Sequence, residues 1–90
     1  MKTVDITSTT SALTITIDGN TAIYPLNFEP KMENGGVQIL IIPFGKFITI
    51  YDNPTITVNG TSFNDSEGNA DFTGMVTALL ALTVPTTTTP

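Results

Sequence analysis

The chain has 90 residues, of which 40% are hydrophobic and only 12% charged, and this balance excludes the polar, highly charged composition of a disordered chain. Three Lys, no Arg and no His stand against eight acidic residues, so the formal net charge is −5, and there is no Cys. Without His or Cys there is no Ser-His or Cys-His nucleophile pair, no thiolate zinc site and no disulfide. We therefore expect one small domain that is not an enzyme and that uses no metal, cofactor or small-molecule substrate.

The charge balance and the chain's ends limit the partners further. Three scattered Lys cannot neutralise the phosphates of a nucleic acid, so nucleic-acid binding is not expected. No apolar run follows Met1 and Lys2 that is long enough for a secretory signal peptide, and no stretch is long enough for a membrane-spanning helix. We expect synthesis in a cytoplasm, without export and without a membrane.

Threonine occurs 18 times and isoleucine ten times, and these β-branched residues favour strands. The first predicted strand covers residues 2–7. A second follows at residues 13–18, where Leu, Ile and Ile alternate with polar residues, and a turn at residues 19–20 would pair Ile17 with Ala22. Pro25 lacks an N–H group, so the returning strand is predicted at a sheet edge or with its proline nitrogen facing outward.

The middle of the chain contains a charged segment and then an apolar one. Residues 29–36 hold three charged side chains and two glycines and are predicted to be a surface loop. Residues 37–42 are apolar at every position except Gln38, which predicts a central strand covered on both faces. A turn at residues 43–46 and a strand at 47–51 complete this part.

A second hairpin is predicted near residue 59. Residues 55–58 form a strand that ends at Asn59-Gly60, a pair suited to a type I′ turn because both central residues need positive φ. In a two-residue loop, Val58 lies opposite Thr61 and Ile56 opposite Phe63.

Apolar residues at helical spacing then predict one amphipathic helix over about residues 70–82. They are Phe72, Met75, Val76, Leu79 and Leu80. The helix is predicted to begin with Asn64 and Glu67 as a capping box, or with Asn69 as its cap.

The acidic residues before this helix alternate in a way that invites comparison with a calcium loop. Counting Asp65 as position one, the sixth position is Ala70 instead of Gly and the twelfth is Val76 instead of Glu. The sharp turn and the bidentate ligand are both missing. Acidic residues that suit the helix dipole are the favoured interpretation.

These elements predict a mostly β (α+β) fold: a small antiparallel β-sandwich of about six to seven short strands with one C-terminal amphipathic helix. The domain covers residues 1–82, and residues 83–90 form an extended Thr/Pro-rich tail, because Pro85 and the threonines disfavour a helix. One short helix covers only part of one sheet face, and few charges protect the strand edges. We therefore expect assembly with other chains, self-association included.

The hairpin of residues 55–63, the acidic cap and the helix from Phe72 to Leu82 occur here in a Thr/Ile-rich acidic chain without Cys or His. With these traits the chain resembles the small non-enzymatic structural proteins of tailed bacteriophage virions, in particular the auxiliary or decoration proteins on capsids of crAss-like phages. The resemblance covers about a third of the chain and a generic motif. It implies binding in many copies to a capsid lattice, with termini that reach neighbouring subunits.

The leading expectation is therefore a virion structural protein at the capsid surface that binds the major capsid protein or other virion proteins. The candidate partner-binding residues are the tail, the proline of the predicted edge strand and the phenylalanine of the turn at residues 43–46: Val84, Pro85, Thr86, Thr87, Thr88, Thr89, Pro90, Pro25 and Phe44. Two alternatives stay open. One is a small acidic adaptor or inhibitor that binds a cationic protein, and the other is a phage tail or fibre component.

Overall fold

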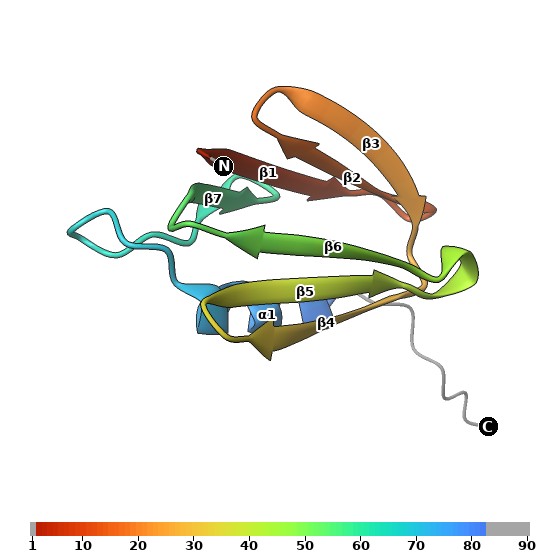
Figure 1. Cartoon of the computed structure of the whole chain (residues 1–90). Helices are drawn as coiled ribbons and strands as arrows, with labels where there is room; N and C mark the ends of the chain where they lie inside the picture. The colour runs from red at the N-terminus through yellow and green to blue at the C-terminus, as the bar shows by residue number, and fades with distance from the viewer. Residues whose placement is uncertain (1, 83–90) are drawn as a thin grey trace.

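The structure, a computed structural model, describes residues 2–82. Two β-sheets face each other and one helix packs at their side (Figure 1). One sheet has five strands in the order β3-β2-β1-β7-β8, and the other has three in the order β4-β5-β6. The elements are β1 Thr3–Ser8, β2 Ala12–Ile17, β3 Asn20–Pro25, β4 Phe28–Glu33, β5 Gly36–Ile41, a 3₁₀-helix η1 Ile42–Phe44, β6 Lys46–Tyr51, β7 Thr55–Val58, β8 Thr61–Ser62 and α1 Phe72–Leu80. The predicted mostly β fold with a C-terminal helix is confirmed.

The five-stranded sheet contains one parallel pair among antiparallel ones. β1 pairs antiparallel with β2, but it pairs parallel with β7, with Val4 beside Ile56. The chain makes the whole three-stranded sheet between β3 and β7, so β7 enters the first sheet after a long crossover, as a parallel neighbour requires.

The first hairpin turns one residue earlier than predicted. Its loop is Asp18-Gly19, with φ values of 50° and 87°, so Ile17 lies opposite Asn20 and not opposite Ala22. Asp18 tolerates positive φ because its carboxylate accepts hydrogen bonds from the backbone N–H groups of Lys2 (2.7 Å) and Thr3 (2.9 Å). The predicted edge position is confirmed, since β3 pairs only with β2 and ends at Pro25.

The predicted loop at residues 29–36 is wrong, because this segment forms β4 and its turn into β5. Phe28 and Pro30 are buried and lie opposite Ile41 and Ile39, so the charged residues alternate outward. Asn34 and Gly35 alone make the turn. The segment alternates between inward and outward residues, as a strand does, but its charged outward residues and the inward Pro30 are more typical of a loop.

β5 is the central strand of its sheet, but the prediction that both of its faces are covered is wrong. Val37, Ile39 and Ile41 are fully buried, whereas Gln38 and Leu40 on the other face are only half-buried. The helix packs against β4, β7 and β5 on the inner side of the sandwich, and no element of residues 2–82 covers the outer face of β5. The three-stranded sheet therefore presents apolar residues to solvent.

The second hairpin confirms its prediction. Val58 lies opposite Thr61, and Asn59 and Gly60 have φ values of 49° and 83°. The N–H of Phe63 donates to the carbonyl of Ile56 (2.9 Å), so this pair also lies opposite as predicted.

The helix covers Phe72–Leu80 and is shorter at both ends than predicted. Both predicted caps are wrong, because Asp71 caps the helix by accepting a hydrogen bond from the N–H of Gly74 (3.0 Å). Asn64 instead accepts from the N–H of Ile56 (2.8 Å) and donates to the carbonyl of Pro54 (3.0 Å), which ties the loop before the helix to β7. An isolated bridge between Asn64 and Ala70 delays the helix.

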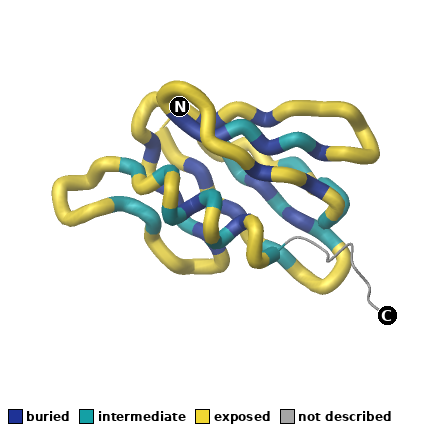
Figure 2. The backbone as a smooth tube through the Cα atoms, turned by 90° about the horizontal axis from the view of Figure 1, so that it is seen from below, coloured by how far each residue is buried: buried dark blue, intermediate teal, exposed yellow. Residues whose placement is uncertain are grey.

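The interior between the sheets is one continuous apolar layer, which Figure 2 shows as dark blue segments inside exposed loops. It consists of Val4, Ile6, Leu13, Ile15, Phe28, Val37, Ile39, Ile41, Ile48, Ile50, Ile56, Val58, Met75 and Leu79. Within residues 2–82 no polar or charged side chain is buried. The fold therefore depends on apolar contact between the sheets.

Replacement of Ile39 by Ala is expected to lower the free energy of unfolding by about 2–5 kcal/mol, because Ile39 is fully buried in this layer. Met32→Ala is the matched control, since Met32 is 49% exposed, and its expected change is within about 0.5 kcal/mol. Urea unfolding followed by circular dichroism measures both. Equal losses for the two variants would contradict this placement of the core.

Candidate partner-binding surface

The connection between β5 and β6 holds apolar side chains in solvent. Ile42 to Phe44 form one 3₁₀ turn, which Gly45 ends at a φ of 62°. The N–H of Ile42 donates to the carbonyl of Asn27 (3.1 Å), which fastens the turn to the connection between β3 and β4. The turn is thus anchored by backbone bonds while its side chains remain exposed.

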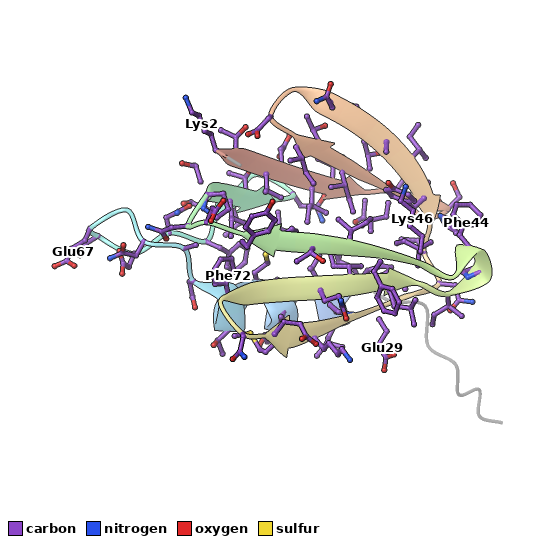
Figure 3. All side chains as sticks on the ribbon, in the orientation of Figure 1. Lys2, Glu29, Phe44, Lys46, Glu67 and Phe72 are labelled. Atoms are coloured by element: carbon purple, nitrogen blue, oxygen red, sulfur yellow. The ribbon has the colours of Figure 1, made fainter. Side chains whose placement is uncertain are left out.

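Two aromatic side chains and one lysine, from three elements, meet at this turn. The rings of Tyr24 and Phe44 lie 6.4 Å apart between centroids, with an interplanar angle of 60°. The ammonium of Lys46 lies 6.0 Å from the centroid of the Tyr24 ring, at the outer limit of a cation–π contact. Figure 3 shows Phe44 and Lys46 together at this end of the molecule.

We call this surface the aromatic end, defined by Tyr24, Ile42, Phe44, Lys46 and Phe47. Phe44 is 61% exposed, Phe47 54% and Ile42 47%. Phe47 lies opposite the half-buried Leu40, which continues the apolar surface along the outer face of β5. Large apolar side chains clustered on a surface are typical of a protein-binding site.

The structure brings two of the predicted partner-binding residues to this end. Pro25 follows Tyr24 directly at the end of β3, and Phe44 contacts the Tyr24 ring. The other predicted residues, Val84 to Pro90, lie outside the described residues. The sequence prediction missed Phe47, although its alternation with the buried Ile48 and Ile50 predicts an outward side chain.

Several carboxylates lie toward the opposite end of the molecule, where Figure 3 places Glu67. We call it the acidic end, defined by Asp52, Asp65, Glu67 and Asp71, all of them exposed. Asn53 joins its two segments, because its side chain donates to that of Asn69 (3.1 Å) and accepts from the N–H of Ala70. The sequence alone did not show that residues 52 and 65–71 meet.

Within the acidic end, Asp65 serves the backbone of its own loop. Its carboxylate accepts from the N–H groups of Asn69 (2.9 Å) and Glu67 (2.9 Å). These bonds favour the charged form, so they hold the pKa of Asp65 below its ordinary value. In the first hairpin turn, the N–H groups of Thr3 and Lys2 lower the pKa of Asp18 in the same way.

The charged side chains offer no enclosed site. All eight acidic residues and three Lys lie within residues 2–82, and each is exposed. In this part of the chain no three His, Cys, Asp or Glu side chains are grouped as metal ligands. The helix of the described residues is too short to cross a bilayer.

Comparison with protein-family models, curated proteins and solved structures gives no match for this chain. The function is therefore argued from the surfaces of the chain itself.

The lowered pKa values of Asp18 and Asp65 predict how stability depends on pH. A depressed folded-state pKa contributes stability above the unfolded value of 3.8, and this contribution is lost as the pH falls through the folded value. The variant Asp18→Asn with Asp65→Asn is expected to lose less stability than the unmodified chain between neutral pH and the acid range below 3.8. Urea midpoints at several pH values measure the difference.

Glu29→Gln is the matched control, because it removes one exposed carboxylate far from both turns in the sequence. It is expected to keep the pH dependence of the unmodified chain. The same slope in all three proteins would contradict the assignment to Asp18 and Asp65.

Proposed function

We propose that the chain is a non-enzymatic virion structural protein, namely a capsid auxiliary or decoration protein that binds the major capsid protein or another virion protein at the capsid surface. The observation that carries the proposal is the aromatic end, an exposed apolar cluster on a domain whose core is already complete. The family resemblance noted from the sequence directs the choice of partner.

The exposure of the aromatic end is not a defect of packing. Ile41 and Ile48, which flank the β5–β6 connection on its inner side, are buried at 0% and 8% exposure, and among residues 2–82 no buried polar side-chain atom lacks a partner. Within residues 2–82, no further element covers Phe44 and Phe47, and a bound partner would bury them. Full burial of such a side chain stabilises by roughly 1.5–3 kcal/mol, so two aromatic residues supply a modest contact.

A modest contact is sufficient when the partner is a repeated surface. A protein that occupies many equivalent sites needs weak individual interfaces, and a second contact by the same copy then acts at high effective concentration. The tail of residues 83–90 is the proposed second contact.

The charge distribution supports one orientation on such a surface. The acidic end lies opposite the aromatic end (Figure 3), so an apolar contact through Phe44 leaves Asp65 and Glu67 in solvent. Carboxylates directed away from the shell keep their hydration and repel the same ends of unbound copies.

Substitution of the aromatic end tests the proposal directly. The double variant Phe44→Ser with Phe47→Ser is expected to bind purified capsid shells of crAss-like phages at least about tenfold more weakly than the unmodified chain does, because each lost aromatic contact costs about 1 kcal/mol or more. Co-sedimentation with the shells measures bound protein. Met32→Ser is the matched control, since Met32 is also half-exposed but lies at the other end of its sheet.

Unchanged binding by the double variant, with Met32→Ser also unchanged, would remove the aromatic end as the contact. Absence of binding by the unmodified chain would contradict the capsid assignment as a whole.

Deletion of residues 84–90 is expected to weaken shell binding and to leave the urea midpoint unchanged, because the apolar layer lies within residues 2–82. The same co-sedimentation assay measures binding, and circular dichroism measures unfolding. Equal occupancy of shells by the truncated and full chains would contradict a role for the tail.

The acidic end favours a second candidate function, an acidic adaptor or inhibitor that binds a cationic protein. Association through Asp52, Asp65, Glu67 and Asp71 slows steeply as salt rises, whereas contact through the aromatic end changes little. Association rates measured across ionic strengths distinguish the two. A tail or fibre component instead predicts a closed ring of the purified protein.

A further inference from the structure

We propose that the free edge of β3 pairs antiparallel with β3 of a second copy, centred on Ala22, so that two five-stranded sheets join into one. This inference rests on the edge of the sheet and does not depend on the capsid assignment.

β3 is an undefended edge strand. It has six residues, carries no charged residue and, within residues 2–82, pairs with β2 alone. In Figure 1 it is the outermost strand on its side, with no element beyond it. An edge of this length and neutrality is a template for another strand, because charges and bulges are what normally prevent such pairing.

The register of the first hairpin fixes which backbone groups of β3 point outward. The Asp18-Gly19 turn makes Ile17 and Asn20 a hydrogen-bonded pair, and in antiparallel pairing these pairs alternate with non-bonded ones. Ala22 and Tyr24 therefore direct their N–H and C=O groups toward β2. Thr21 and Ile23 direct their N–H and C=O groups away from the sheet. The nitrogen of Pro25 also points away from β2, so its missing N–H removes no hydrogen bond to β2.

Among antiparallel pairings of β3 with itself, the one centred on Ala22 uses this edge best. It places Thr21 opposite Ile23 of the second copy and Ile23 opposite the second Thr21, so both outward residues of each strand donate and accept. Centring on Ile23 would place Thr21 opposite Pro25, which has no N–H to donate. Centring on Thr21 would leave Ile23 opposite the turn residue Gly19.

The other edges do not fit a second copy equally well. In the middle of β4, the backbone nitrogen of Pro30 points to the free edge but has no N–H to donate, and pairing centred on Lys31 would place Glu29 opposite Glu33. β8 has only two residues. The free edge of β6 faces the five-stranded sheet in Figure 1.

Side chains support the same pairing. Ile23 is 68% exposed, the highest value among the large apolar residues of the described chain. In the proposed pairing it lies against Thr21 of the second copy, and the two Ile23 side chains are diagonal neighbours on one face. The small Ala22 lies at the two-fold axis, where the two strands approach most closely.

Cysteine cross-linking tests the register, and it is clean because the chain has no Cys. Ala22 and its symmetry mate form a non-bonded pair with Cα atoms about 4.5 Å apart, within the range for a disulfide. Ala22→Cys is therefore expected to form a disulfide-linked dimer at least about tenfold faster than Thr21→Cys or Ile23→Cys, whose mates are displaced by two residues.

The two controls are informative because Thr21 and Ile23 are more exposed than the half-buried Ala22. Random collision would cross-link the controls at least as fast as Ala22→Cys. Equal or faster cross-linking of either control would overturn the proposal.

Sedimentation of the unmodified chain and of a proline variant provides an independent test. The mass of the unmodified chain measured by sedimentation is expected to rise with concentration from 9.6 kDa to twice that value. Ile23→Pro is expected to remain monomeric and folded, since the Ile23 N–H is not used within the sheet, whereas Ile23→Ala keeps the donor and is expected to dimerise. A monomer at all accessible concentrations, or a dimer that survives Ile23→Pro, would overturn the proposal.

Discussion

The contact between the two sheets is the interaction on which the rest of the structure depends. A chain of this size buries one apolar layer, so each strand has one inward face and its charged residues lie outside. Among the described residues 2–82, this single layer leaves the outer face of β5 without cover. The aromatic end and the free edge of β3 are thus consequences of a core that is complete but small.

Hydrogen bonds from polar side chains hold together segments that are far apart in the sequence. Asn59 accepts a hydrogen bond from the N–H of Ser8 (2.9 Å), and Thr57 donates to Asp5 (2.7 Å), so both hold β7 beside β1. Asn64 bonds to β7 and its preceding turn, while Asn53 bonds to the segment before the helix. Side-chain amides therefore satisfy backbone groups where the chain leaves regular pairing.

Local patterns predicted the elements whose pairing is also local. The alternation in β2, the Asn59-Gly60 turn and the helical spacing from Phe72 all appear in the structure because short-range geometry decides them. The charges of β4 concealed a strand, since its inward residues are recognisable only against β5. For the same reason Phe44 and Pro25 could be proposed singly, but their meeting at Tyr24 could not.

The amino-acid sequence by itself determined the mostly β composition, the Asn59-Gly60 turn and the single amphipathic helix, because propensity and periodicity act over a few residues. Only the tertiary structure decided that β7 lies parallel to β1, that Asp71 caps the helix and that the elements of residues 2–82 leave one face of β5 open. Each of these depends on which distant segments pack together in the apolar layer, and a local sequence pattern does not determine that packing.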